Sequence, residues 1–104
     1  MNNYMFGSSG MDYKIAQKVS GVLKAVAHPI RLQIIEALEP GELCVGKIME
    51  KVGFQQAVIS QQLSLLKDKD ILDCRREGTS VYYRIKNKNV IYLLECVYHH
   101  CEHP

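Results

Sequence analysis

The C-terminal stretch of the sequence carries side chains that can bind a metal ion. Cys96, His100 and His103 follow one another at i, i+4 and i+7, which places them on one stripe of a helix. A thiolate and two imidazoles are good ligands for Zn(II) and related ions. The alternative interpretation is a polar helix end with no ligand. The residues alone leave both interpretations open.

The chain has four cysteines, Cys44, Cys74, Cys96 and Cys101, and no pair of them forms a CxxC motif. Nothing else indicates secretion, so we expect reduced thiols and a cytoplasmic protein. Cys44 is expected at the start of a short helix, where a thiol becomes more reactive. Cys74 falls in an expected strand and is interpreted as structural. Cys96 and Cys101 are five residues apart and point in different directions, so we expect no bridge between them.

A second group of polar residues has the chemistry of base recognition. Gln55, Gln56, Ser60, Gln61 and Ser64 lie in the first turns of an expected helix. Glutamine can form two hydrogen bonds with adenine, and serine can bond to bases or phosphates. The alternative is an ordinary solvated helix face. The turn and hairpin that flank this helix favour contact with DNA.

Basic residues in the next segment could pair with phosphates. Arg75, Arg76 and Arg84 lie in an expected β-hairpin, and Arg76 is the strongest candidate because it is nearest the turn. Tyr82 and Tyr83 are adjacent, so one is expected to face inward and the other outward. Simple surface solubility is the competing explanation for each arginine.

Apolar spacing predicts the elements that position these groups. Asp12 is a good N-cap for the first helix, the pair at 28–29 ends that helix, and Gly53 ends the third. The expected helices are 12–26, 29–38, 43–52, 55–68 and 87–101, and the expected strands are 71–76 and 81–85. In the last helix Val90, Leu93, Leu94, Val97 and Cys101 form one buried stripe. The order α-α-α-α-β-β-α predicts a mainly α fold with a small β-hairpin, a winged helix-turn-helix.

Length and composition narrow the function class. The 104 residues predict one domain over 12–104, after a flexible tail over 1–11. The winged helix-turn-helix order predicts DNA binding by that domain, and a core this small would gain from contact with a second copy of the chain. The net charge of +2 is too small to indicate nucleic-acid binding by itself. The sequence has neither an apolar run of the roughly 18 residues that a membrane span needs nor a glycine-rich phosphate loop. We therefore expect neither a membrane protein nor an enzyme.

Four segments together resemble the ArsR/SmtB family of winged-helix repressors: LKAVAHPIRLQII at 23–35, ELCVG at 42–46, AVISQQL at 57–63, and RREG at 75–78 followed by VYY at 81–83. The resemblance covers residues 12–103. It implies a homodimer formed through the first and last helices, bound to near-palindromic double-stranded operator DNA as a sequence-specific repressor. The alternative function is a winged-helix protein–protein adaptor that does not bind DNA.

The resemblance also implies release from the operator by an effector, and three types compete. Zinc sensors of the family have a ligand pair that His100 and His103 match, but Asn87 and Asn89 stand where the other pair would be. Asn side chains are weak ligands, so the usual four-ligand zinc site is incomplete.

The other two effector types act on thiols. Arsenite sensors place two or three cysteines in the segment that here holds Cys44 alone, with Gly46 where a second would be. As(III) would then need help from Cys96 or Cys101. A dithiol switch for persulfides or oxidants would pair Cys44 with Cys101. Relatives with such a switch place the first cysteine within the second helix, where this chain has Glu36.

Overall fold

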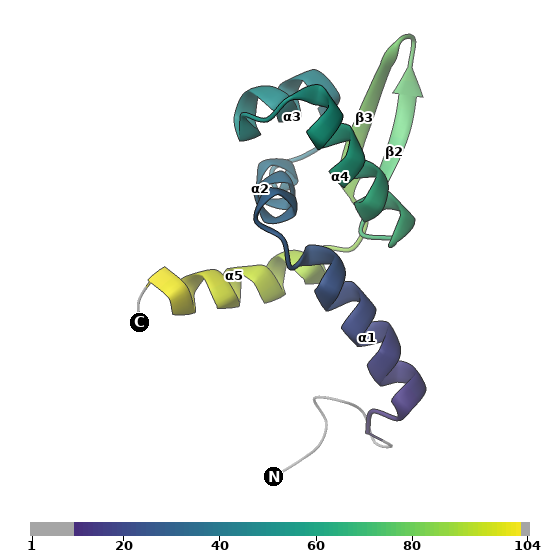
Figure 1. The fold of residues 1–104 in the computed structure, drawn as a ribbon, viewed down its shortest axis with the longest axis vertical. Coiled ribbons are helices and arrows are strands. Elements are labelled where there is room, and N and C mark those ends of the chain that lie inside the picture. Colours follow the sequence, from purple (N-terminus) through teal and green to yellow (C-terminus); the bar gives the residue numbers. More distant parts are fainter. Residues whose placement is uncertain (1–9, 103–104) are drawn as a thin grey trace.

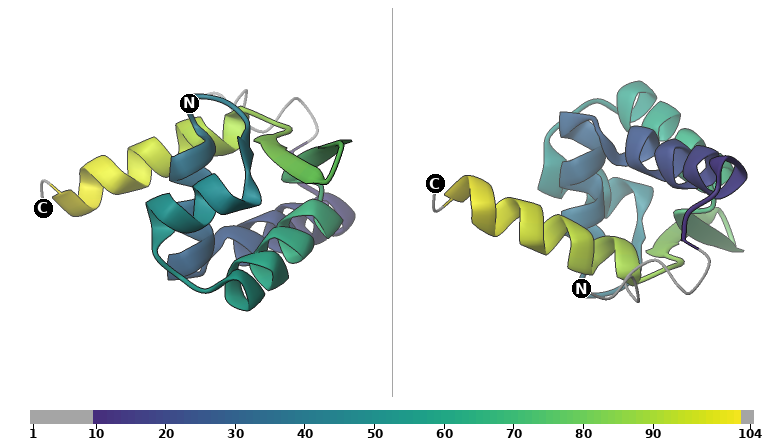
Figure 2. Two further views of the ribbon diagram at one scale, coloured as in Figure 1. Left: turned by 90° about the horizontal axis from the view of Figure 1, so that it is seen from above. Right: turned by 90° about the horizontal axis from the view of Figure 1, so that it is seen from below.

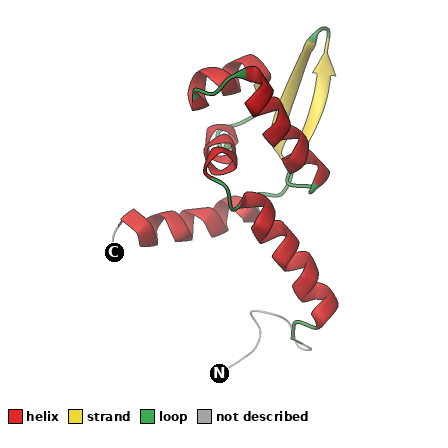
Figure 3. Ribbon diagram, viewed as in Figure 1, coloured by secondary structure: helices red, strands yellow, loops and turns green. Residues whose placement is uncertain are grey.

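The computed structural model describes residues 10–102 as five helices and a small sheet (Figures 1 and 3). Most of the expected N-terminal tail, residues 1–9, and the candidate ligand His103 lie outside the described residues. The elements are α1 (Tyr13–Val26), α2 (Pro29–Leu38), β1 (Leu43–Cys44), α3 (Val45–Val52), α4 (Gln56–Asp68), β2 (Leu72–Glu77), β3 (Ser80–Ile85) and α5 (Asn89–Glu102). This architecture confirms the predicted mainly α fold with a β-hairpin.

The first two helices begin where their capping residues predict. The Asp12 carboxylate accepts a hydrogen bond from the Ile15 N–H at 2.9 Å and so satisfies a free donor of the first turn of α1. His28 caps α2 in the same way, because its Nδ1 accepts from the Ile30 N–H at 3.1 Å. Pro29 is the first residue of α2, where a missing N–H has no cost.

The sheet has three strands in the order β1-β3-β2, one more than the predicted hairpin. The prediction that the third helix begins at residue 43 is therefore wrong. Leu43 and Cys44 form β1, which pairs antiparallel with Tyr83 and Tyr82 of β3, and α3 begins only at Val45. The cause is non-local: the open edge of β3 offers backbone partners that the local apolar spacing does not reveal.

The hairpin strands are each one residue longer toward the turn than predicted, because Glu77 pairs with Ser80. This leaves a loop of two residues. Gly78 has a positive φ of 64°, which suits the first central position of a tight hairpin turn.

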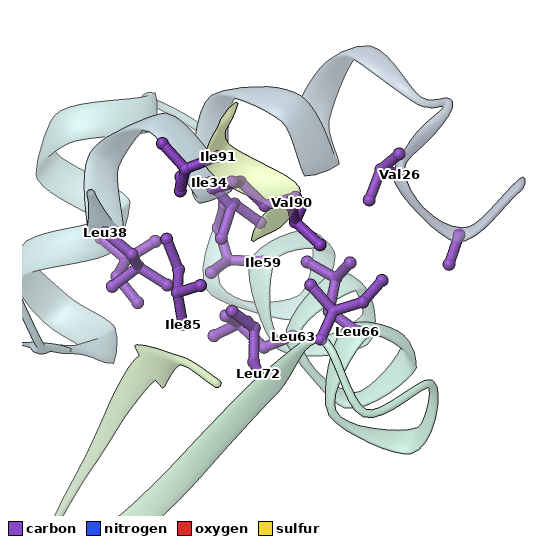
Figure 4. Close-up of a cluster of buried hydrophobic side chains, with 14 residues drawn as sticks. Val26, Ile34, Leu38, Ile59, Leu63, Leu66, Leu72, Ile85, Val90 and Ile91 are labelled. Atoms are coloured by element: carbon purple, nitrogen blue, oxygen red, sulfur yellow. The ribbon is translucent and has the colours of Figure 1, made fainter. Parts of the chain in front are cut away.

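One apolar core joins α2, α4 and the sheet (Figure 4). The fully buried side chains of α4 are Ile59, Leu63 and Leu66. They pack in the cluster that also contains Ile34, Ile35, Leu38, Ile48, Ile71, Leu72 and Ile85. The apolar spacing of the sequence predicted most of these positions. The core therefore fixes one side of α4 and leaves the other side to face outward.

The helices α1 and α5 extend away from this core in different directions (Figures 1 and 2). Several of their apolar side chains are exposed: Ile15, Val19, Val22, Leu23, Leu93 and Val97. The predicted buried stripe of the last helix is therefore largely wrong for a single chain, since Cys101 is also exposed and only Val90 of that stripe is buried. The helix packs against the core through its N-terminal part, where Val90 and Ile91 are buried and Leu94 is half-buried. Within residues 10–102, none of the helices has the length and apolarity that crossing a bilayer requires.

Gly53 links the two helices of the helix-turn-helix, and its conformation yields a stability prediction. It has a φ of 90° and donates its N–H to the Met49 carbonyl at 2.8 Å, which ends α3. Gly53→Ala should reduce the free energy of unfolding by about 1 kcal/mol, because side chains are strained in the left-handed region. Urea unfolding followed by circular dichroism would measure this loss.

Gly46→Ala provides the matched control. Gly46 lies inside α3, and a Cβ added at either glycine has no heavy atom within 4 Å. Alanine at position 46 should leave stability equal or higher, since alanine favours helices by up to about 1 kcal/mol. Equal losses in both variants would refute the conformational argument.

Candidate nucleic-acid interface

The outward face of α4 carries the polar residues predicted to contact DNA. Gln56, Gln61 and Ser64 are exposed, as is Gln55 just before the helix, and Ser60 is half-buried. The buried stripe of Ile59, Leu63 and Leu66 on the opposite side determines this orientation. The helix thus presents amides and hydroxyls, the groups that hydrogen-bond to base edges and phosphates.

A hydrogen bond from α2 contributes to holding α4 in place. The Arg31 guanidinium donates from Nη1 to the Gln62 Oε1 at 2.8 Å, and both side chains are half-buried. The charge-assisted bond joins two residues 31 positions apart in the sequence. This role of Arg31 was not predicted from the sequence, where the one local signal is a charged residue inside an apolar helix stripe.

The two neighbouring arginines of β2 lie on opposite faces of the hairpin. Side chains alternate along a strand, and the register pairs Arg76 with Val81 and Arg75 with Tyr82. Arg76 therefore belongs to the same face as Leu72 and Ile85, which pack on the core beside α4. Arg75 lies on the outer face of the sheet. Arg76 is one pair away from the last pair before the turn, so it lies near the free end of the hairpin. That end extends past α4 (Figure 1).

The side chain of Arg76 is available for a phosphate. Among residues 10–102, no hydrogen bond or ion pair engages its guanidinium. Arg75 differs, because it donates to the Glu42 carboxylate from Nε at 3.0 and 3.1 Å and also from Nη2. Its Nη1 donates to Glu77 at 3.2 Å, and its guanidinium carbon lies 4.6 Å from the centre of the Tyr82 ring.

The other basic residues of the hairpin are also paired. Arg84 donates to the Asp73 carboxylate at 2.9 Å, and Lys86 donates to Asp70 at 2.9 Å. The hydrogen bond donated by Arg84 lowers the pKa of Asp73, and the hydrogen bond that Lys86 donates to Asp70 raises the pKa of Lys86. Tyr83 faces inward, as one of the two tyrosines was expected to do, and burial raises the pKa of its hydroxyl.

The candidate sensing residues are distributed over two separate regions. All four cysteines are free thiols; Cys44 is half-buried in β1, whereas Cys96 and Cys101 are exposed on α5. His100 is exposed on the same helix. Within residues 10–102 of one chain, no three His, Cys, Asp or Glu side chains are grouped closely enough to hold a metal ion.

Cys101 is one of the residues that line a groove between α2 and α5. The groove has a volume of about 540 Å³, and Leu32, Ile35, Leu94 and Val97 are among the apolar side chains that line it. Glu36 lines the same groove, and Cys44 does not. The structure therefore places Cys101 beside α2, and it does not bring together the two thiols of the predicted dithiol switch.

Glu42 is a second residue that the sequence analysis missed. It precedes β1, and its hydrogen bonds from Arg75 lower the pKa of the Glu42 carboxyl. The two residues are 33 positions apart, and only the unpredicted strand β1 brings them together. No local pattern in the sequence marked this pair.

Known proteins resemble this chain in sequence and in fold. The model of the arsR family of bacterial regulatory proteins matches residues 28–73, from the cap of α2 into β2. A biofilm growth-associated repressor of Agrobacterium fabrum is 38% identical over 85 residues, which are 82% of this chain and 73% of the relative.

Two solved structures are also similar. The antimony-specific transcriptional repressor AntR aligns with a TM-score of 0.80 and 32% identity, over 90% of this chain and 88% of its own. A homodimeric winged helix-turn-helix DNA-binding domain from Mycobacterium bovis aligns with a TM-score of 0.75 and 34% identity, over 91% of both chains. These relatives are regulators rather than enzymes, as the sequence analysis expected. The chain belongs to the arsR family of bacterial regulatory proteins, which are winged helix-turn-helix transcriptional repressors.

Proposed function

We propose that this chain is a homodimeric, sequence-specific DNA-binding repressor, which a metal, metalloid or thiol-reactive effector releases from its operator. The observation that carries the proposal is the arrangement of α4 and the hairpin. The polar face of α4 is exposed, and Arg76, which no side chain within residues 10–102 engages, lies on the hairpin face that packs beside this helix. A helix that contacts bases and a hairpin that contacts phosphates together form a DNA-binding surface. We call the β2–β3 hairpin the wing.

In this proposal the residues divide by chemistry. Gln55, Gln56, Ser60, Gln61 and Ser64 contact base edges and nearby phosphates in the major groove, and Arg76 contacts the backbone. Arg75 belongs to the same basic hairpin, but its guanidinium is already engaged by two carboxylates. Two copies of α4, related by two-fold symmetry, would read a near-palindromic operator with half-sites about 34 Å apart.

The exposed apolar faces of α1 and α5 support the homodimer. Both helices leave the core with bulky aliphatic side chains uncovered in a single chain. Burying such surface stabilises association by roughly 25 cal/mol per Å² of apolar area. We propose that these two helices form the interface.

The first prediction from this proposed function separates contact with phosphates from contact with bases. Arg76→Ala should weaken binding to all DNA sequences, and it should lower the slope of log affinity against log salt by about 1.8 per dimer, one phosphate contact per protomer. Gln61→Ala should instead lower the preference for the operator over unrelated DNA and leave the slope unchanged. Fluorescence anisotropy at several salt concentrations would measure both.

Lys14→Ala is the charge control, because it removes one positive charge from α1 and should change neither quantity. If the wild-type protein shows no salt-dependent binding to DNA, the adaptor function replaces the repressor. If Arg76→Ala has the same small effect as Lys14→Ala, Arg76 does not contact phosphate.

The second prediction concerns the dimer interface. Leu23→Asp should convert the dimer to a monomer, because it buries a carboxylate in the apolar contact. Phe54→Asp is the control: Phe54 is 40% exposed and Leu23 45%, but Phe54 lies between α3 and α4. Sedimentation velocity would give the mass of each. A Leu23→Asp protein that stays dimeric would place the interface elsewhere.

The effector site is proposed from donor chemistry. AntR is described as antimony-specific, and trivalent metalloids of this group bind thiolates. We propose Cys44, Cys96 and Cys101 as the thiols that respond to As(III) or to a thiol reagent. We propose His100 and His103 as the ligands for Zn(II). The described donors of one chain do not cluster, and we propose that a site with several ligands combines donors from both protomers.

The third prediction distinguishes these effectors. Reduced, metal-free protein should bind operator DNA, and anisotropy should be repeated with Zn(II), with As(III) and with a persulfide donor. Cys44→Ser should abolish release by As(III) and by the donor while the response to Zn(II) persists. The double variant His100→Ala, His103→Ala should lose release by Zn(II) and keep release by As(III) and by the persulfide donor. Full zinc release in the double variant, or full thiol release in Cys44→Ser, would refute the corresponding site.

A further inference from the structure

We propose that Arg75 is a positioning residue, which joins β1 to β2 and so fixes the angle of the wing relative to α4, and that it does not contact DNA. The inference rests on the proposed DNA-binding function. It assigns Arg75 a role different from that of Arg76, although the two arginines are adjacent and have the same chemistry.

The contacts of Arg75 engage all three nitrogens of its guanidinium. Nε and Nη2 form a fork on the Glu42 carboxylate, and Nη1 reaches Glu77 at 3.2 Å. The guanidinium carbon also lies over the Tyr82 ring, 4.6 Å from its centre. A single exposed ion pair contributes little to stability, but a bidentate pair in a network with a stacked ring is the kind that holds its geometry.

The position of this network in the sheet explains what it would hold. Cys44, Tyr82 and Arg75 form one row across the three strands, and Glu42 lies two residues before Cys44 on the same face. The Glu42–Arg75 pair therefore bridges the two outer strands across β3. It reinforces β1, which has only two residues in the ladder.

The strand β1 leads directly into the helix-turn-helix. Cys44 is the N-cap of α3, and no side-chain hydrogen bond caps that helix end. A bond between Glu42 and the wing thus connects the hairpin to the start of α3. Without it, the hairpin remains attached to the body through the apolar contacts of its inner face, but the outer edge of the sheet is less constrained.

Removing the charge of Glu42 distinguishes the two roles of Arg75. If Arg75 binds phosphate, Glu42→Gln frees it and removes a repelling carboxylate, so DNA binding becomes tighter. If Arg75 positions the wing, the same change loosens the hairpin and DNA binding becomes weaker. The two roles therefore predict opposite signs.

The experiment is a double-mutant cycle on the full chain, with operator affinity measured against salt. Glu42→Gln and Arg75→Gln should each weaken binding by about 3- to 10-fold with the salt slope unchanged, and the double variant should be no weaker than Arg75→Gln alone. Arg75→Lys should bind DNA as weakly as Arg75→Gln, because lysine keeps the positive charge but lacks the planar fork. Tighter binding by Glu42→Gln, or a slope reduced by about two per dimer in Arg75→Gln, would overturn the proposal.

Asp70→Asn is the control for net charge. It removes one carboxylate from the exposed Lys86–Asp70 pair, which does not join β1 to β2. It should not weaken binding, so an equal weakening in Asp70→Asn and Glu42→Gln would also overturn the proposal.

Amide hydrogen exchange of the free protein supplies a readout that does not depend on DNA. Glu42→Gln should reduce protection at Leu43 and Tyr83, the hydrogen-bonded pair between β1 and β3, and leave α4 protected. If the wild-type protein fails to bind DNA, the proposed function is wrong, and this exchange measurement still tests the role of Arg75. Unchanged protection at both amides would overturn it.

Discussion

The surface proposed to bind DNA depends on one constraint, the burial of three aliphatic side chains along α4. Ile59, Leu63 and Leu66 are fully buried, and their spacing allows only one rotation of the helix against α2 and the sheet. That rotation directs Gln61 and Ser64 outward. Neither the wing nor the Arg31–Gln62 hydrogen bond could present these groups if the helix were free to rotate, so the apolar core is the primary determinant of the site.

The same core leaves the rest of the chain under-packed. A chain of this size buries only about 60–70% of its unfolded surface, and here the cluster is concentrated between α2, α4 and the sheet. The helices α1 and α5 contribute their inner ends to that cluster, and their remaining apolar residues stay exposed. A second copy of the chain would supply the missing contacts, in agreement with the homodimeric relative. In our proposal, association is a consequence of the small core.

The fold was predictable where local chemistry decides it. Asp12, the pair at 28–29 and Gly53 end or begin helices through their own backbone and side chains, and the structure confirms each of them. The strand β1 was not predictable, because two residues contain no periodicity and their partner strand lies about 40 residues later. The Glu42–Arg75 pair was hidden for the same reason. The buried stripe expected along α5 failed because apolar spacing identifies a face that needs a partner and does not say whether that partner belongs to the same chain.

These constraints also limit how an effector could act on DNA binding. Within one protomer, α4 is fixed by the core, and in our proposal the wing is fixed by Arg75. We therefore expect α4 and the wing of each protomer, the DNA-reading unit, to move together as a rigid body. An effector changes affinity only if it binds two states of the protein differently. With rigid reading units, the states must differ in the arrangement of the two protomers, which sets the distance between the two copies of α4. The groove at Cys101 lies between α2, which packs on α4, and α5, which carries the exposed apolar face. A ligand or adduct in this groove would act between the helices that hold α4 and the proposed dimer interface. A ligand or adduct at Cys44 would instead act beside the wing.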